Sequence, residues 1–166
     1  LNWEDRRQRQ RCIRDSIVSD QPLKSRIRAA AEKEEQESYN GRMPEEWLKD
    51  LAPIGTDWQK PFLETAPSLI IVFKRSYEPE AGGHKHQNYY VTESVGLACG
   101  FLLAAIHHAG LVAITHTPSP MNFLARILNR PENEKPFLLI PVGYAAQACW
   151  VPDLKRKALH EVSCWY

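Results

Sequence analysis

The most constraining feature of this sequence is the stretch Tyr89–His108, which has the length of a long helix and carries apolar side chains on almost every side. A helix that is apolar all round has to be covered by protein on most of its surface. Its longest apolar run, Val95–Ile106, is too short to span a bilayer, so it indicates a buried helix. Small residues such as Gly96 and Gly100 permit close approach of neighbours. We therefore expect the chain to bury this helix and to dimerise through it.

Short β-branched runs bounded by turn residues predict the strands of a sheet. They are Leu69–Phe73, Leu111–Thr115 and Phe137–Val142, and Ile17–Val18 is open as the end of a further strand. Helix signals lie between them, which indicates an α+β or α/β fold. A sheet of this size is small for the chain, so either another strand is absent or a partner subunit completes the packing.

Helix and loop signals divide the rest of the chain. Pro22 suits a first helical turn and Asp20 or Gln21 suits its cap, so a helix is expected from residue 22 to 39, stopped by Asn40–Gly41. The other expected elements are the helices Pro44–Leu51 and Met121–Leu128, a mobile flap at Asp57–Glu64, a loop at Glu78–Gln87 and a tail at Cys149–Tyr166.

Charge and cysteine usage exclude several classes of function. The chain has 21 basic and 20 acidic residues, so no strong field recruits nucleic acid or an anionic membrane. The one local excess, five arginines between residues 6 and 14, is interpreted as a solvated N-terminal arm. The four cysteines have no metal-binding spacing and suggest no disulfide framework, which favours a reducing compartment. We expect no metal site and a soluble or cytoplasmic chain, with an upstream membrane anchor left open.

Several stretches in their order along the chain resemble the iodotyrosine deiodinases of the nitroreductase superfamily. They are residues 34–39, 56–60, 89–110, 115–118, 140–144 and 151–157, and the resemblance covers roughly residues 17–162. It implies an α+β, nitroreductase-like three-layer sandwich with a long buried dimer-interface helix. It also implies FMN as cofactor, a homodimer whose active sites are built from both subunits, a halotyrosine substrate and a nicotinamide-derived reductant.

The resemblance assigns a substrate clamp to Glu35, Tyr39 and Lys60. Glu35 and Tyr39 are four residues apart and so share one helix face, while Lys60 comes from the expected flap. A carboxylate, a phenol and an ammonium can hold the ammonium and carboxylate groups of an amino acid. On spacing alone, an exposed helix face and an unrelated lysine are the favoured interpretation, so the assignment depends on the surrounding resemblance.

The resemblance assigns the cofactor to two other segments. Thr115, His116 and Thr117 follow an expected strand and match the segment that lines the flavin, where Thr117 matches the threonine that hydrogen-bonds flavin N5 and tunes the reduced cofactor. Arg156 matches an arginine at the FMN phosphate, a task that suits the guanidinium fork. The alternatives are an ordinary strand-to-helix turn and a basic solvated tail.

The N-terminal part departs from the family pattern. Residues 1–16 form a divergent arm ahead of a nitroreductase-like domain at 17–166, and Arg6–Arg9 does not reproduce the arginine-rich phosphate-binding segment of the family. We therefore expect an N-terminally incomplete fold and weak FMN binding. The expected function is reductive deiodination of iodotyrosine. The alternatives are a nitroreductase-like flavin reductase with another aromatic substrate, and a degenerate, non-catalytic dimeric protein.

Overall fold

The fold is organised around one antiparallel sheet. The computed structural model describes residues 12–166, so the arginines at 6, 7, 9 and 11 lie outside the described residues. The main sheet has four strands in the order β1-β2-β6-β5. They are β1 (Ile13–Val18), β2 (Ser68–Arg75), β6 (Glu134–Gly143) and β5 (Val112–Ala113). The predicted strand end at Ile17–Val18 is confirmed as the end of β1, which provides an additional strand beyond the three predicted runs.

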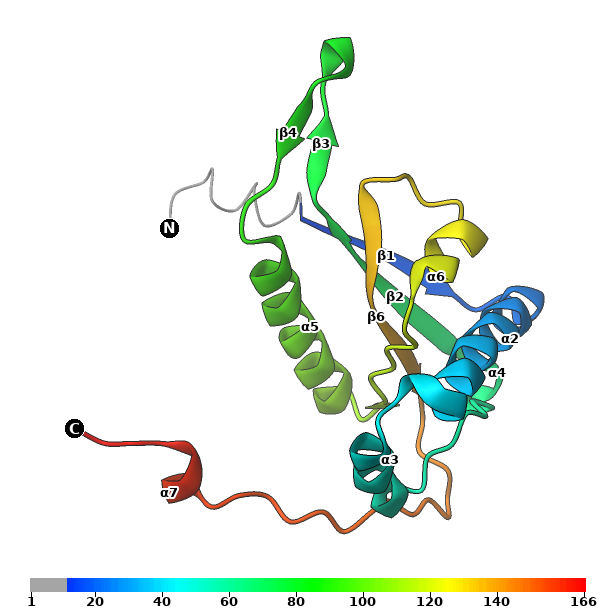
Figure 1. The fold of residues 1–166 in the computed structure, drawn as a ribbon, viewed down its shortest axis with the longest axis vertical. Coiled ribbons are helices and arrows are strands. Elements are labelled where there is room, and N and C mark those ends of the chain that lie inside the picture. Colours follow the sequence, from blue (N-terminus) through cyan, green and yellow to red (C-terminus); the bar gives the residue numbers. More distant parts are fainter. Residues whose placement is uncertain (1–11) are drawn as a thin grey trace.

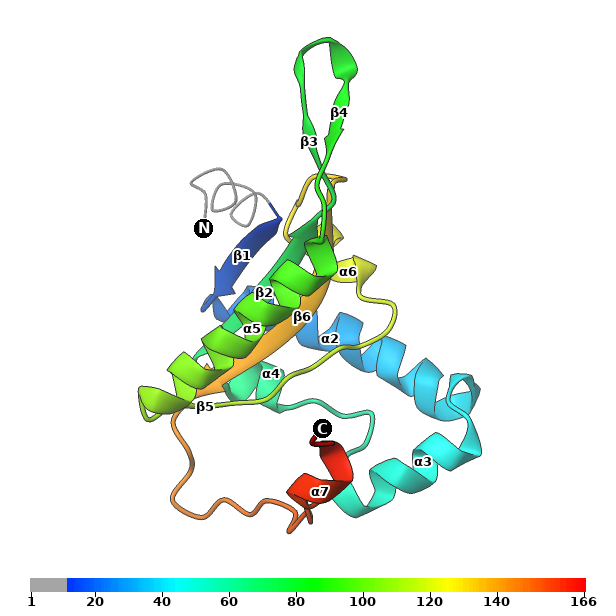
Figure 2. The same ribbon diagram turned by 90° about the vertical axis from the view of Figure 1, so that its left-hand side faces the viewer.

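Helices cover both faces of this sheet (Figures 1 and 2). α5 (Val91–His108) lies on one face, and α2 (Gln21–Glu37), α4 (Phe62–Thr65) and α6 (Asn122–Ile127) lie on the other. Each interface has its own apolar core, because side chains alternate across a strand. In β2, Ile71 and Phe73 belong to the core under α2, while Val72 belongs to the core under α5. The predicted α+β three-layer sandwich is confirmed.

The local signals at the start of α2 are confirmed, whereas its end differs from the prediction. The Asp20 side chain accepts a hydrogen bond from the Leu23 backbone N–H at 2.8 Å, and Pro22 lies in the first turn. The helix ends at Glu37 and continues as a π-helical turn, Ser38–Arg42, in which Gly41 has φ 143°. Tyr39 therefore lies in this turn rather than in the α-helix. The positive φ of Gly41, which glycine adopts readily, takes the chain out of the α-helical conformation there.

A predicted loop and a predicted strand also differ from the elements of the structure. The predicted loop at residues 78–87 contains a two-stranded hairpin of β3 (Tyr77–Pro79) and β4 (Lys85–Gln87), which projects from the body (Figure 2). Its strands are short and polar, so no hydrophobic alternation marked them. The predicted strand at residues 111–115 contracts to β5, and the chain meets β6 again only through a bridge between His116 and Leu139. The remaining short elements are α3 (Glu45–Leu51), two turns of 3-10 helix at Ala52–Ile54 and Ala81–Gly83, and α7 (Leu159–Val162).

In the single chain, α5 is buried only on the side that faces the sheet. Val95, Cys99 and Ile106 are buried, whereas Leu97 and Phe101 on the outer side are 66% and 78% exposed. By length and composition alone this helix is able to cross a membrane, in contrast to the prediction from its apolar run. A single such helix is weak evidence of a membrane span, and α5 here forms one layer of the sandwich.

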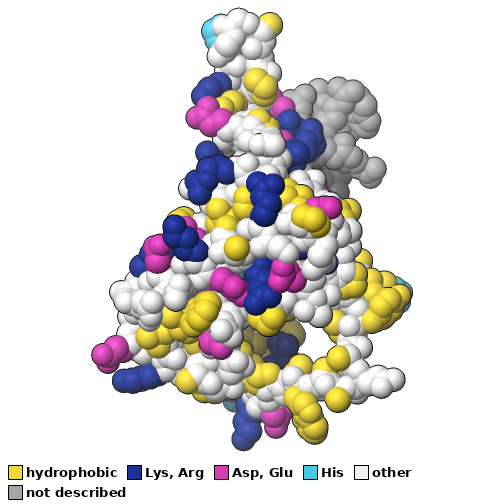
Figure 3. Space-filling view, turned by 90° about the vertical axis from the view of Figure 1, so that its right-hand side faces the viewer, with side chains coloured by type: hydrophobic (Ala, Val, Ile, Leu, Met, Phe, Trp, Pro, Cys, Tyr) yellow, Lys and Arg dark blue, Asp and Glu magenta, His cyan; other side chains and the backbone are white. Residues whose placement is uncertain are grey.

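Two further features of the molecule are the mixed charges on one face and the extended C-terminal segment. Figure 3 shows charged side chains of both signs mixed over the face that carries α2, α4 and α6. The C-terminal segment leaves the body after β6 and carries α7 (Figure 1). Its aromatic side chains are exposed, with Trp150 at 94% and Trp165 at 86%. Of the cysteines, Cys12 and Cys99 are buried in the body, whereas Cys149 and Cys164 are exposed on this segment.

Candidate active site

A cavity of about 450 Å³ opens between α2, the loop before α4 and the segment after β5. This volume lies within the range of small-molecule sites in proteins, roughly 300–1,000 Å³. Its lining contains six of the seven residues that the sequence singled out. The lining residues are Glu35, Ser38, Tyr39, Arg42, Met43, Trp47, Leu51, Thr56, Lys60, Thr115, His116, Thr117 and Ser119.

Lys60 is the charged centre of this cavity. It is only 4% exposed, and its ammonium lies 3.5 Å from the Glu35 carboxylate. The ammonium also donates to the Thr56 hydroxyl at 3.1 Å and to the Asp57 carbonyl. A buried cation needs such partners, because an unpaired charge inside a protein is costly. The structure thus brings Glu35 and Lys60 together from α2 and from the predicted flap.

Tyr39 stands beside the same cation. Its hydroxyl donates to the Thr56 carbonyl at 3.2 Å, and the Lys60 ammonium lies 5.8 Å from its ring centroid. Burial raises the pKa of the Tyr39 phenol, and the nearby Glu35 and Asp57 carboxylates raise it further, while the Thr56 side chain lowers it. The phenol is therefore protonated at neutral pH and can act as a donor.

His116 is the buried member of the segment after β5. Its backbone N–H and C=O pair with Leu139 at 2.9 and 3.1 Å, and its ring meets the Phe62 ring edge-on at 5.6 Å between centroids. Its Nε2 atom is buried and has no hydrogen-bond partner among residues 12–166. Burial, and secondarily the Lys60 ammonium, lowers the pKa of His116 to about 4, so the imidazole is neutral at physiological pH.

Thr115 and Thr117 lie on either side of His116 in the chain and are both exposed. Successive side chains of an extended segment point to opposite sides, so the two threonines share one side and His116 takes the other. All three residues line the cavity. Thr115 and Thr117 are thus accessible to a ligand, whereas the imidazole of His116 is buried against the Phe62 ring.

Arg156 is the one predicted site residue that the structure leaves outside the cavity. It lies on the exposed C-terminal segment between β6 and α7. Sequence reasoning also missed several lining residues, among them Arg42, Trp47 and Thr56. Thr56 stands four residues before Lys60, a spacing that suits a local contact, but Arg42 and Trp47 carried no local signal that pointed to the site.

Comparisons with known proteins show the family to which the chain belongs. The model of the nitroreductase family matches residues 7–144, and the chain belongs to this family. Three curated relatives are iodotyrosine deiodinases. The protein from Haliscomenobacter hydrossis is 69% identical over 85% of this chain and 64% of its own length. The relative from Nematostella vectensis is 47% identical over 88% of this chain and 56% of its own.

The human relative, iodotyrosine deiodinase 1, is 44% identical over 88% of this chain and 51% of its own length. The chain thus spans about half to two thirds of the length of these relatives. The resemblance to iodotyrosine deiodinases seen in the sequence is confirmed by these matches.

Solved structures show the same likeness. An iodotyrosine deiodinase bound to FMN and 3-iodo-L-tyrosine superimposes with a TM-score of 0.73 at 31% identity, covering 89% of this chain and 73% of that protein. A nitroreductase-like protein from Streptococcus mutans shares the fold, with a TM-score of 0.63 at 13% identity over 100% of this chain and 88% of its own.

Proposed function

We propose that the protein is an FMN-dependent oxidoreductase that removes iodine from iodotyrosine, a halotyrosine, by reduction. The observation that carries this proposal is the buried Glu35–Lys60 ion pair, which shares one cavity with the accessible hydroxyls of Thr115 and Thr117. A site that can bind the ammonium and carboxylate groups of an amino acid thus lies beside a surface that can bind the flavin ring. The similarity to iodotyrosine deiodinases over most of the chain supports the same assignment.

The cavity has features that suit the flavin ring. Its lining combines apolar side chains with hydroxyl donors, as pockets for planar cofactors do. The Thr117 hydroxyl would donate to flavin N5, and the backbone of residues 115–117 would line the ring. When bound, FMN supplies the electron pair for the reduction. Arg156 would hold the phosphate, and since it lies outside the cavity of its own chain, we assign this contact to the assembled homodimer.

The substrate would be held by its zwitterion. The Glu35 carboxylate accepts from the amino group, the Lys60 ammonium binds the carboxylate, and the Tyr39 phenol donates a further hydrogen bond. Overall, the aryl carbon–iodine bond breaks and a carbon–hydrogen bond forms. The substrate gains an electron pair and a proton, and iodide leaves. A nicotinamide-derived reductant would restore the electron pair.

The exposed face of α5 supports the homodimer. Leu97 and Phe101 present apolar surface that no described residue of the single chain covers. Surfaces of this kind mark protein–protein contacts when they form a patch. We assign this face to a second copy of the chain.

The test is a pair of equilibrium titrations. FMN binding is followed by quenching of flavin fluorescence, and the loaded protein is then titrated with 3-iodotyrosine and with 2-iodophenol, which lacks the zwitterion. The proposal predicts saturable FMN binding and a clear preference for iodotyrosine. Equal affinity for the two aromatic ligands would favour a flavin reductase with another substrate. Absence of FMN binding at any concentration would favour a non-catalytic protein.

A further inference from the structure

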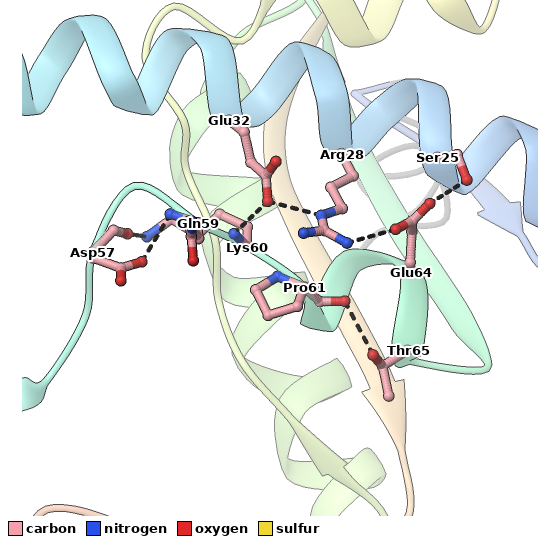
Figure 4. A network of polar contacts seen from close by, with 9 residues as sticks. All are labelled: Ser25, Arg28, Glu32, Asp57, Gln59, Lys60, Pro61, Glu64 and Thr65. Atoms are coloured by element: carbon pink, nitrogen blue, oxygen red, sulfur yellow. Dashed lines mark hydrogen bonds and ion pairs between the residues drawn. The ribbon is translucent and has the colours of Figure 1, made fainter.

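A row of polar residues on α2 holds Lys60 and the chain segment that follows it through hydrogen bonds and ion pairs. Figure 4 shows this network, which runs from Ser25 through Arg28 and Glu32 to the loop at Asp57–Lys60 and to α4. Residues 24, 28 and 32 are spaced by four, so their side chains lie along one face of the helix. This face points toward residues 60–66 rather than into solvent.

The C-terminal part of this segment makes several hydrogen bonds and an ion pair with α2. The buried Lys24 ammonium donates to the carbonyls of Glu64 at 3.0 Å and Ala66 at 2.7 Å. The Glu64 carboxylate pairs with Arg28 at 2.6 Å and accepts a hydrogen bond from the Ser25 hydroxyl. These contacts involve charged groups, which make the stronger hydrogen bonds in proteins. The chain downstream of Lys60 is therefore fixed to α2.

Glu32 extends this attachment to Lys60 itself. One oxygen of Glu32, Oε1, accepts the Lys60 backbone N–H at 2.7 Å and the Arg28 Nε–H at 2.7 Å. The Glu32 side chain is 18% exposed, so the contact is partly shielded from water. Three residues further along the helix, Glu35 pairs with the ammonium of the same lysine at 3.5 Å. Lys60 is thus held by α2 at both its main chain and its side chain.

The ammonium of Lys60 makes two hydrogen bonds and one longer ion pair in this arrangement. It carries three N–H groups, and it has partners at Glu35, at the Thr56 hydroxyl and at the Asp57 carbonyl. The ion pair with Glu35 is the longest of these contacts, at 3.5 Å, so it is the one that a ligand carboxylate replaces most readily. Glu35 can give up its contact with Lys60, because the ammonium group of the same ligand then pairs with the Glu35 carboxylate.

We propose that Glu32, braced by Arg28, is a positioning residue that holds the main chain of Lys60 while its ammonium exchanges Glu35 for the ligand's carboxylate. This inference rests on the proposed function, since it concerns the same amino-acid clamp. The exchange needs a fixed lysine backbone, because otherwise ligand binding also has to order the loop, which opposes binding through lost conformational entropy.

The test compares Glu32→Ala and Glu32→Gln with a matched control, Lys33→Ala, an exposed residue on the same helix. For Glu32→Ala we expect the Kd of 3-iodotyrosine to rise about tenfold, which equals roughly 1.4 kcal/mol. The affinities for FMN and 2-iodophenol stay unchanged, because neither ligand uses the zwitterion clamp. Glu32→Gln keeps an acceptor oxygen and recovers most of the affinity, and the control binds like the wild type.

A readout without ligand separates this inference from the proposed function. Hydrogen exchange of the peptide that contains the Lys60 amide should accelerate in Glu32→Ala and not in Lys33→Ala. Unchanged exchange together with unchanged preference for iodotyrosine overturns the positioning role. An equal loss of FMN, iodophenol and iodotyrosine binding also overturns it, since that pattern indicates a general folding defect. A wild-type protein that binds iodophenol as well as iodotyrosine contradicts the proposed function instead.

Discussion

Lowering the pH from 8 to 5.5 should destabilise the folded protein through His116. The imidazole is 8% exposed, and its folded-state pKa is about 4 against an ordinary value of 6.5. Burial is the main cause, and the Lys60 ammonium adds to it. The unfolded chain therefore binds a proton at His116 under conditions in which the folded chain does not.

The sign and size of the effect follow from this difference. Stability linked to His116 is fully present above pH 6.5, is lost as the pH falls, and stops changing below about pH 4. The full difference corresponds to about 3 kcal/mol, because each pKa unit is worth roughly 1.36 kcal/mol. At pH 5.5 the unfolded imidazole is about 90% protonated, so the free energy of unfolding should be about 1 kcal/mol lower than at pH 8.

The assay is urea denaturation of the wild type, His116→Gln and His108→Gln at several pH values between 5.5 and 8. Glutamine does not titrate, so His116→Gln should lose most of the decrease whatever its stability at pH 8. His108 is exposed on α5, and its replacement should leave the decrease in place. Parallel pH profiles for the wild type and His116→Gln would refute the buried, neutral imidazole.

Three further predictions concern the clamp, the core and the assembly. Lys60→Ala should weaken 3-iodotyrosine binding by about 1.5–3 kcal/mol, the scale of a hydrogen bond to a charged group, with 2-iodophenol unaffected in the same titration. Leu124→Ala, at a fully buried core position, should lower the free energy of unfolding by about 2–5 kcal/mol in urea, whereas Trp165→Ala should leave it unchanged. Phe101→Asp should shift the protein from dimer to monomer in light scattering at micromolar concentration, and a dimer that persists would exclude α5 as the interface.

The elements predicted well from the sequence are those encoded locally. The cap of α2 needs only Asp20 and Pro22 at the right spacing, and the central strand β2 is a continuous apolar run bounded by turn residues. β1 was predicted only in part, because Arg14, Asp15 and Ser16 interrupt its apolar pattern. Its strand conformation comes from pairing with β2 across a long separation in sequence, which no local pattern records.

The site shows the same division. The resemblance to a family identified Glu35, Tyr39 and Lys60, and the structure gathers them in one cavity. The second role of α2 was not predicted, because the contact between Glu32 and the Lys60 backbone joins residues 28 positions apart. The burial of His116 depends on Phe62 and on β6, so the sequence alone gave no reason to separate it from its threonine neighbours.

Reductive turnover without oxygen tests the central claim most directly. The protein is supplied with excess FMN, the flavin is reduced chemically, and 3-iodotyrosine is added while iodide and tyrosine are measured. The account predicts that iodide and tyrosine appear in equal amounts, one of each for every reduced flavin consumed, and that Lys60→Ala slows their appearance at limiting substrate. If the protein binds reduced flavin and no iodide is released from iodotyrosine, the assignment is contradicted.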